Sequence, residues 1–580
     1  MRVLLGHSKW APAGQRGAMS QYFSHYETLL VTSKSTDIEN GTLSERVALE
    51  HARARSICRA SGLTLEDIRD LTDKFWDFHF DPIAARDMTA FIIATIHLNL
   101  CIGTLSHFVS SKPYFRNIVT RLLRFEACGE FMLTEIGHGL DARNLETTAT
   151  MRQDGSFTLH SPSSSSAKAM PPTTPLCTMP RIAVVFARLL VYGEDRGVKT
   201  FLVQLTDGDS MCPGITSRPL PTRPGTRPLD HSITTFENVW LPADSLLSDP
   251  AKAVDERSSF LQQIRRVSVG TLSLSIMGVS ALKAGAYIVT TYSQRRYVCE
   301  GPSRSPILAF STQHRPILRA WTYSIILELY ARWTVSNFMS LAGEASTRHA
   351  MAVIFKVAAM KAPVMLDDLS ERCGWQGLFK HNQLKELSLT FQGNTVAEGD
   401  CLVLCIRLVS ELLGRKYDIP EAQDTSSPLS VREASLRAYA AREVTRVGGY
   451  TAHRDRAFDQ VINPLSRPLV EAIGERMAVE AGKYLGADPH VLQLFEYFCM
   501  ERNIDWHVGN DITARSAFGD AMSQACSAAL PLMLRSHQES RIKDYVYAPI
   551  VSEAGWGRFF SGLPVFEGPE EPVSTHRSRL

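Results

Sequence analysis

The chain has 580 residues, of which 44% are hydrophobic and 21% are charged, which is typical of a globular protein with three or four structural units. Lys and Arg number 62 against 60 Asp and Glu, so the formal net charge of +2 provides no electrostatic basis for binding nucleic acid or an anionic membrane. The 11 cysteines include no C-x-x-C pair or dense cluster, which argues against a disulfide framework and against a zinc site.

The first part of the chain, up to about residue 125, is predicted to be helical. Segments such as Leu43–Ala60 and Met88–Val109 repeat apolar residues at helical spacing and contain no proline. The most apolar stretch, Phe91–Val109, is nearly long enough to span a membrane. It contains histidine, asparagine and serine, which are costly in hydrocarbon, so we expect a buried core helix and no membrane span.

Short runs rich in β-branched and aromatic residues follow, from about residue 131 to 247, and predict a small β domain. The clearest hairpin is predicted where Ile182–Tyr192 and Val198–Leu205 flank the turn sequence GEDRG. Two segments rich in turn-forming residues, Ser161–Pro175 and Cys212–Pro228, are predicted to be loops.

The rest of the chain is predicted to be helical in two blocks, separated by a Pro- and Ser-rich break at Pro420–Pro428. The first block contains the expected helices Phe260–Ser293, Pro316–Leu341, His349–Leu369 and Gly399–Leu413, and the second runs from Val431 to Arg541. The expected domains are therefore 1–128, 129–248, 249–418 and 429–565, with a tail at 566–580.

The last three residues, Ser578, Arg579 and Leu580, are similar to the S-K-L tripeptide that the peroxisomal import receptor reads. Arginine keeps the positive charge of the usual lysine, and the Pro- and Glu-rich segment before it is expected to leave the tripeptide accessible. An accidental tripeptide is the alternative. The ending therefore favours a peroxisomal location.

Six motifs resemble those of the acyl-CoA oxidases. The stretch TEIGHG (Thr134–Gly139), with NLETTATM (Asn144–Met151) after it, closely resembles the TE-[LI]-GHG…GLETTA signature of that family. The others are HFDP (His79–Pro82) with RDM (Arg86–Met88), FENVWLP (Phe236–Pro242), RR (Arg295–Arg296) with PILAFSTQ (Pro306–Gln313), CGWQG (Cys373–Gly377) and EGD (Glu398–Asp400). Each is weak alone, but they follow the family's order and spacing across roughly residues 79–415.

This resemblance to the acyl-CoA oxidase and dehydrogenase family implies an α+β, mainly α fold, with an N-terminal helical domain, a central β domain that binds flavin, and two C-terminal helical domains. It also implies an FAD cofactor, an acyl-CoA substrate, molecular oxygen as electron acceptor, and a homodimer in which each subunit completes its neighbour's FAD site.

The resemblance assigns the catalytic base to Glu398 in the EGD motif. Desaturating a thioester requires removal of an α proton, and a carboxylate suits this task if apolar surroundings raise its basicity. The family also uses the backbone N–H of this residue to hold the thioester oxygen. Alternatively, Glu398 and Asp400 only cap the helix that follows.

Five residues are expected to contact FAD because they match family positions: Thr134, Arg295, Gln313, Gly374 and Gly377. Each also has an ordinary structural explanation, such as a strand hydroxyl, a solvated arginine, a polar helix start or turn glycines. His138 in the GHG turn is expected to pack or to bond to backbone, without a catalytic role.

Several positions depart from the family pattern near the expected flavin and CoA contacts: Ala169, Met170, Pro172, Ser311, Trp375 and Cys401. Pro172 stands where the family has a glycine that donates its N–H to FAD, and proline has no N–H. The pocket could be reshaped for an unusual acyl group, or flavin binding could be weakened. Four functions therefore stay open: an oxidase, a dehydrogenase using an electron-transfer flavoprotein, a tailoring desaturase of a secondary-metabolite pathway, and an acyl-CoA-binding protein without turnover.

Overall fold

The computed structural model describes residues 41–341 and 344–568, so the expected tripeptide at 578–580 lies outside the described residues. The N-terminal helices are α3 (Leu43–Ser61), α4 (Leu65–Asp70), α5 (Asp73–Phe80), α6 (Ile83–Arg86), α7 (Met88–Thr95), a π-helical segment (Ile96–Ile102), α8 (Gly103–Leu105) and α9 (Tyr114–Leu123). Capping boxes at Thr42 and Thr64 start α3 and α4, because each threonine and the acidic residue three positions later satisfy each other's free N–H group.

The β domain contains β1 (Cys128–Met132), β2 (Thr148–Met151), β3 (Phe157–His160), β4 (Lys168–Pro172), β5 (Arg181–Val191), β6 (Glu194–Thr206), β7 (Ile215–Pro219), β8 (His231–Phe236) and β9 (Val239–Leu241). One sheet has the order β1-β5-β2-β3-β9 with β6 also paired to β5, and a second sheet has the order β4-β8-β7. The predicted hairpin is β5–β6, which turns at Tyr192 and Gly193, both with positive φ.

The two segments predicted to be loops in this domain each contain a strand, so those predictions were wrong in part. β4 lies within Ser161–Pro175 and β7 lies within Cys212–Pro228, and both pair with β8. The prolines and serines in both segments are typical of loops, so the sequence pattern did not indicate these strands. In β4 the prolines are tolerated because a bulge interrupts the pairing between Ala169 and Pro172.

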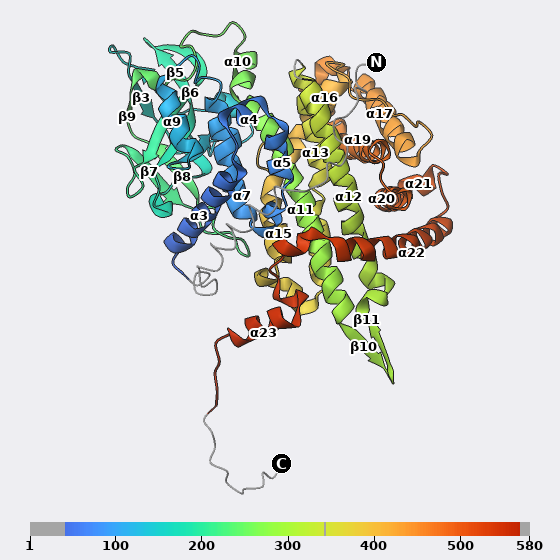
Figure 1. The fold of residues 1–580 in the computed structure, drawn as a ribbon. Coiled ribbons are helices and arrows are strands. Elements are labelled where there is room, and N and C mark those ends of the chain that lie inside the picture. Colours follow the sequence, from blue (N-terminus) through green and yellow to red (C-terminus); the bar gives the residue numbers. More distant parts are fainter. Residues whose placement is uncertain (1–40, 342–343, 569–580) are drawn as a thin grey trace, which may run out of the picture.

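The next helices surround α11, which runs through the middle of the molecule (Figure 1). This part contains α10 (Glu256–Gln263), α11 (Arg265–Arg295), the hairpin β10 (Tyr297–Glu300) and β11 (Ser303–Pro306), α12 (Ser311–Ser340), α13 (Ala345–Ala359), α14 (Ala362–Glu371), α15 (Leu384–Gln392) and α16 (Cys401–Leu413). The expected single helix His349–Leu369 is two helices, because Pro363 cannot continue α13 and instead lies in the first turn of α14, which begins at Ala362.

The C-terminal block contains α17 (Pro428–Arg446), α18 (Arg456–Val461), α19 (Asn463–Tyr484), α20 (Pro489–Glu501), α21 (Ile504–Gly509), α22 (Arg515–Glu539) and α23 (Glu553–Ser561). α19 packs against α12, α13, α16 and α17, and joins this block to the helices around α11. The fold is α+β and mainly α, as the sequence predicts. In Figure 1 the N-terminal helices lie between the β domain and α11.

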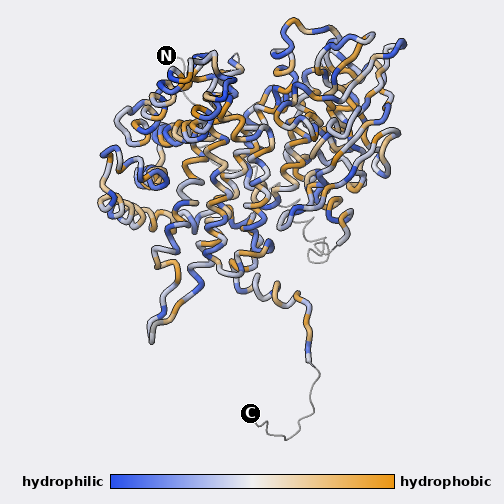
Figure 2. Tube along the Cα trace, turned by 180° about the vertical axis from the view of Figure 1, so that it is seen from behind, coloured by the Kyte–Doolittle hydropathy of each residue, from blue (hydrophilic) through white to orange (hydrophobic). Residues whose placement is uncertain are grey.

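Three helical stretches are long and apolar enough to cross a membrane by length and composition: Met88–Leu105, Arg265–Arg295 and Ala345–Glu371. Their most apolar windows are 94%, 89% and 83% buried within the protein. Hydrophobic residues are concentrated along these central helices in Figure 2. The first stretch is thus packed in the core, as its sequence predicts.

Candidate active site

Glu398 lies in the loop before α16, but it does not cap that helix. The cap is Asp400, whose carboxylate accepts hydrogen bonds from the N–H groups of Leu402 and Val403, at 2.9 Å and 3.1 Å. Glu398 itself has φ +55°, a left-handed conformation that is unusual for a residue with a side chain, and Gly399 follows with φ +97°. Of the two acidic residues in the EGD motif, Asp400 therefore caps α16 and Glu398 does not.

Three consecutive carbonyl groups in this loop accept hydrogen bonds from buried side chains. Lys356 of α13 donates from Nζ to the carbonyls of Ala397 and Gly399, each at 2.6 Å. Thr271 of α11 donates from Oγ1 to the carbonyl of Glu398 at 2.9 Å. Since the N–H of a trans peptide points opposite to its carbonyl, the Glu398 N–H faces away from Lys356. This N–H has no acceptor among the described residues.

The Glu398 carboxylate lies against the backbone of α11 at Gly270. A Cβ at that position would lie only 2.8 Å from Oε2 of Glu398 and still closer to Cδ and Oε1. Burial of the carboxylate raises its pKa to about 8, because it loses water, although the positive charges of Lys356 and Arg266 partly offset this effect. A raised pKa makes the ionised carboxylate a stronger base for proton abstraction, and the group is mostly ionised above about pH 8.

Sequence analysis missed the residues that hold Glu398: Arg266, Gly270, Thr271 and Lys356. The sequence pattern could have revealed one of them: Lys356 is the only charged residue in the apolar run AMAVIFKVAAM, most of which forms α13. A lysine in such a run must either be exposed or have buried oxygen partners. In the structure Lys356 is 1% exposed, burial lowers its pKa, and its partners are the buried carbonyl oxygens described above.

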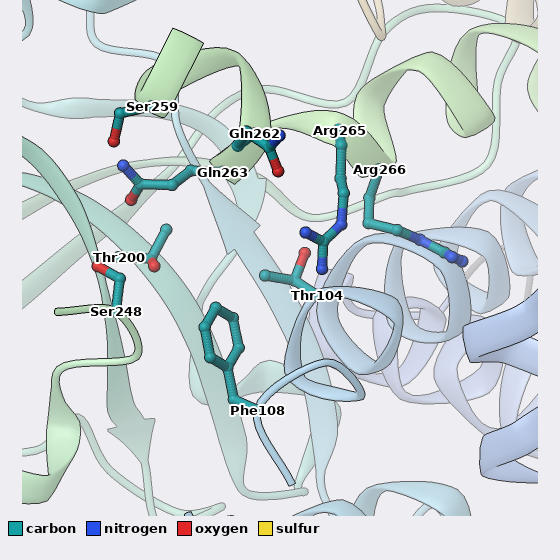
Figure 3. Close-up of a pocket in the computed structure, with 9 residues that line it drawn as sticks. All are labelled: Thr104, Phe108, Thr200, Ser248, Ser259, Gln262, Gln263, Arg265 and Arg266. Carbon is teal, nitrogen blue, oxygen red and sulfur yellow. The ribbon is translucent and has the colours of Figure 1, made fainter. Parts of the chain in front are cut away.

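A cavity of about 200 Å³ lies between the β domain, the N-terminal helices and the start of α11 (Figure 3). We call it the α10–α11 cavity. It is lined by Thr104, Phe108, Thr200, Ser248, Ser259, Gln262, Gln263, Arg265 and Arg266. Arg266 connects the cavity to Glu398, because it lines the cavity, lies one helical turn (about 6 Å) before Gly270 on α11, and acts on the Glu398 carboxylate through its charge.

Thr134 follows β1 and lies beside β4, where its carbonyl accepts the N–H of Ala169 at 3.0 Å. Its hydroxyl makes no hydrogen bond to a described residue. The next residue, Glu135, is buried and ion-paired to Lys168 at 2.9 Å, which fixes the turn. The side chain of His138 bonds to the carboxylate of Glu146 at 3.3 Å, so its partner is a side chain and not the backbone bond that the sequence analysis expected.

Arg295, Gln313, Gly374 and Gly377 come together at the opposite end of α11 from Glu398. Gln313 donates to the hydroxyl of Ser293 at 2.9 Å and to the carbonyl of Arg372 at 2.8 Å. Arg295 donates to the carbonyl of Ile550 at 3.2 Å. We call these four residues the far-end cluster.

The glycines of this cluster are required by close packing and by the backbone. Gly377 is buried against the carbonyl of Ser370, and a side chain there would overlap that oxygen. Gly374 has φ +58°, which favours glycine.

The predicted site residues thus fall into separate groups within one chain. Gly270, beside Glu398, and Ser293, beside Gln313, are 23 residues apart on α11, which corresponds to about 35 Å. Among the described residues, no hydrogen bond joins Thr134 to Glu398 or to the far-end cluster.

The residues present fit a flavin with one backbone donor fewer than the family pattern. The free hydroxyl of Thr134 and the free N–H of Glu398 are both available to a ligand. Pro172 has no N–H, and its carbonyl is held by the buried Arg181 at 2.9 Å, so this part of β4 cannot turn to supply another donor.

One buried group outside this site has metal-ligand atoms close together, although the cysteine spacing had argued against a zinc site. The ligand atoms of His51, Cys128 and Glu130 all lie within 4.8 Å of one another. Arg181 forms an ion pair with Glu130 at 2.7 Å, so this carboxylate already has a cationic partner. We assign the group to the packing of α3 on β1.

No protein-family model matches the chain. It is 27% identical over 315 residues to the putative peroxisomal acyl-coenzyme A oxidase 1.2 of Arabidopsis thaliana, an alignment that covers 50% of this chain and 47% of that protein. It is 24% identical over 385 residues to peroxisomal acyl-coenzyme A oxidase 3 of Homo sapiens, covering 58% and 55% of the two chains. The matches therefore span about half the length of these curated relatives.

Solved structures agree with the chain over nearly its whole length. Acyl-CoA oxidase 1 from Yarrowia lipolytica matches with a TM-score of 0.77 and 17% identity, covering 98% of this chain and 97% of that one. Acyl-CoA oxidase 1 of Caenorhabditis elegans, solved in complex with FAD and ATP, matches with a TM-score of 0.74 and 16% identity, covering 93% and 90%. At this identity, the likeness establishes the fold.

Proposed function

Since this chain is a divergent relative of the acyl-CoA oxidases, we propose that it uses FAD to desaturate an acyl-CoA to the trans-2-enoyl-CoA and passes the electrons to oxygen. The products are then the enoyl-CoA and hydrogen peroxide. The observation that carries the proposal is the Glu398 carboxylate, which is held against α11 at Gly270 and has a pKa raised to about 8.

Glu398 would remove the α proton, and its backbone N–H would stabilise the negative charge that develops on the thioester oxygen. Both groups belong to one residue, so fixing its backbone places base and donor together. Lys356 and Thr271 supply this fixation through three carbonyl groups. Their hydrogen bonds leave the N–H free for the substrate.

Bound FAD would accept the β hydride and transfer electrons to oxygen. Thr134 would bind the flavin, while Arg295, Gln313, Gly374 and Gly377 would bind the FAD of a second copy. The separation of about 35 Å between Glu398 and the far-end cluster supports a homodimer, because a neighbouring chain could complete each site. Sedimentation of the FAD-loaded protein at micromolar concentration should give a dimer, and a monomer would contradict this part.

We further propose a peroxisomal location, with import directed by Ser578–Leu580. The curated relatives described above are named as peroxisomal enzymes, and the tripeptide has the chemistry of the import signal.

The loss of an N–H donor at Pro172 supports one alternative, an acyl-CoA-binding protein without redox turnover. The colour of the purified protein distinguishes this alternative from the oxidase, because an active flavoprotein is yellow. A colourless protein that cannot be reconstituted with FAD would support the alternative. A dehydrogenase or a tailoring desaturase would use the same base, and peroxide release distinguishes the oxidase from a dehydrogenase that needs another acceptor.

The direct test is Glu398→Gln, which is nearly isosteric and cannot accept the proton. Single-turnover flavin reduction, normalised to bound FAD, should fall by about 10²–10⁴-fold. Glu421→Gln, at an exposed loop position, is the control for an acid-to-amide change and should reduce flavin normally. A normal rate in Glu398→Gln would remove the base from this residue.

A further inference from the structure

The α10–α11 cavity collects buried polar atoms that lack partners. Among the described residues, Oγ1 of Thr104, Oγ1 of Thr200, Oγ of Ser248, Oε1 of Gln263 and Nη2 of Arg266 are buried and make no hydrogen bond. All five belong to side chains that line this one cavity. Buried polar atoms are nearly always paired in proteins, so their convergence indicates a polar ligand.

The cavity also has more positive than negative charge. Arg265 and Arg266 both line it, and neither forms an ion pair with a carboxylate in the described residues. In Figure 3, Arg265 extends from the start of α11 toward Thr104, whereas the side chain of Arg266 extends away from Arg265. The Arg266 guanidinium donates to the carbonyls of Asn99 and Ile68, each at 3.0 Å. Within the described part of the chain, no acidic side chain lines the cavity. An arginine that faces a polar cavity without an acidic partner is suited to bind a carboxylate.

The position of the cavity limits which part of a thioester can reach it. A base must lie within hydrogen-bond reach of the α carbon, and Arg266 is about 6 Å along α11 from the residue that contacts Glu398. The phosphates of CoA are separated from the thioester by the whole pantetheine arm. That arm carries amides and a hydroxyl but no anion, so it would leave Arg265 without a countercharge.

We propose that the α10–α11 cavity binds a carboxylate carried by the acyl group, so that the substrate is a short acyl-CoA with an acidic end in place of a plain alkyl chain. This assignment rests on the proposed function at Glu398. Arg265 binds the carboxylate, and the hydroxyls of Thr104, Thr200 and Ser248 donate to it or to other oxygens of the acyl group.

The test measures binding alone, so it does not depend on turnover. S-(4-carboxybutyl)-CoA and S-pentyl-CoA are thioethers that differ only in the terminal group, and neither can lose an acidic α proton. Isothermal titration should give a Kd for the carboxybutyl compound about 10- to 100-fold lower than for the pentyl compound. Arg265→Gln should remove this difference, whereas Arg442→Gln, at an exposed position on α17, should preserve it.

Free CoA is the third probe and identifies the source of any effect. If Arg265→Gln weakens free CoA as strongly as the carboxybutyl compound, the arginine contacts CoA itself and the proposal is wrong. Equal or tighter binding of S-pentyl-CoA by the unaltered protein would also overturn it, since the cavity would then hold only water or an alkyl chain. Failure of both thioethers and of CoA to bind folded protein would instead contradict the acyl-CoA function.

Discussion

The carboxylate of Glu398 lies directly against Gly270, one turn beyond Arg266 on α11. Helix α11 can approach the catalytic loop this closely only because position 270 has no side chain. The proposed base is therefore positioned by two elements, the loop that holds its backbone and the helix that limits its carboxylate.

Gly270→Ala should displace the Glu398 carboxylate without removing it. An added methyl group would overlap Cδ and both oxygens, and a misplacement of about 1 Å can cost on the order of 10²-fold in rate. Single-turnover flavin reduction measures the loss. Gly285→Ala on the same helix is the matched control, because its methyl group would meet Leu366 and Leu369 instead. The control should lose about 1–3 kcal/mol of stability and keep its turnover per folded molecule. Equal losses of rate in both variants would refute the special role of Gly270.

The rate should increase with pH through the pKa of Glu398. Burial raises this pKa to about 8, so the group is mostly protonated at neutral pH and cannot act as a base. The value of kcat/KM, which reports the free enzyme, should therefore rise to a plateau above about pH 8. A profile already flat from about pH 6 would mean that Glu398 keeps its ordinary acidity or is not the base.

Lys356→Met should change both the rate and the pH profile. Its ammonium group holds the carbonyls of Ala397 and Gly399, and its charge favours the ionised form of Glu398. Its loss should lower flavin reduction by about 10- to 100-fold and move the rising limb of kcat/KM to higher pH.

Lys361→Met controls for the loss of a buried lysine in the Lys356 experiment. Lys361 is also largely buried, but its partner is Glu475 at 2.7 Å, away from the catalytic loop. This variant should lose stability and keep the pH profile. An unshifted limb in Lys356→Met would show that the lysine has only a structural role.

Deleting Ser578–Leu580 should move the protein from peroxisomes to the cytosol. The measurement is microscopy of cells that lack the full-length chain, since a full-length partner could carry the shortened protein inside. Peroxisomal import of the deletion variant under these conditions would show that the tripeptide is not the signal.

The sequence predicted the main helices and the β5–β6 hairpin because their periodicity and turn residues act locally. It predicted the wrong state for β4, whose prolines are accommodated by a bulge and by pairing with β8, which lies 59 to 66 residues further along the chain. Glu398 was proposed through its motif, and its catalytic role stays a prediction. Gly270, Thr271 and Lys356 could not be connected to it, because they come from two other helices and meet only after these pack together.

The left-handed backbone conformation of Glu398 destabilises the folded state, and a glycine at this position would not have this effect. A non-glycine residue in this region costs about 1–3 kcal/mol, and a carboxylate enclosed by protein adds to that cost. Glu398→Gly should therefore melt at a higher temperature than the natural protein while losing turnover. A higher melting temperature together with lost turnover would show that Glu398 stabilises the reaction at the expense of the fold.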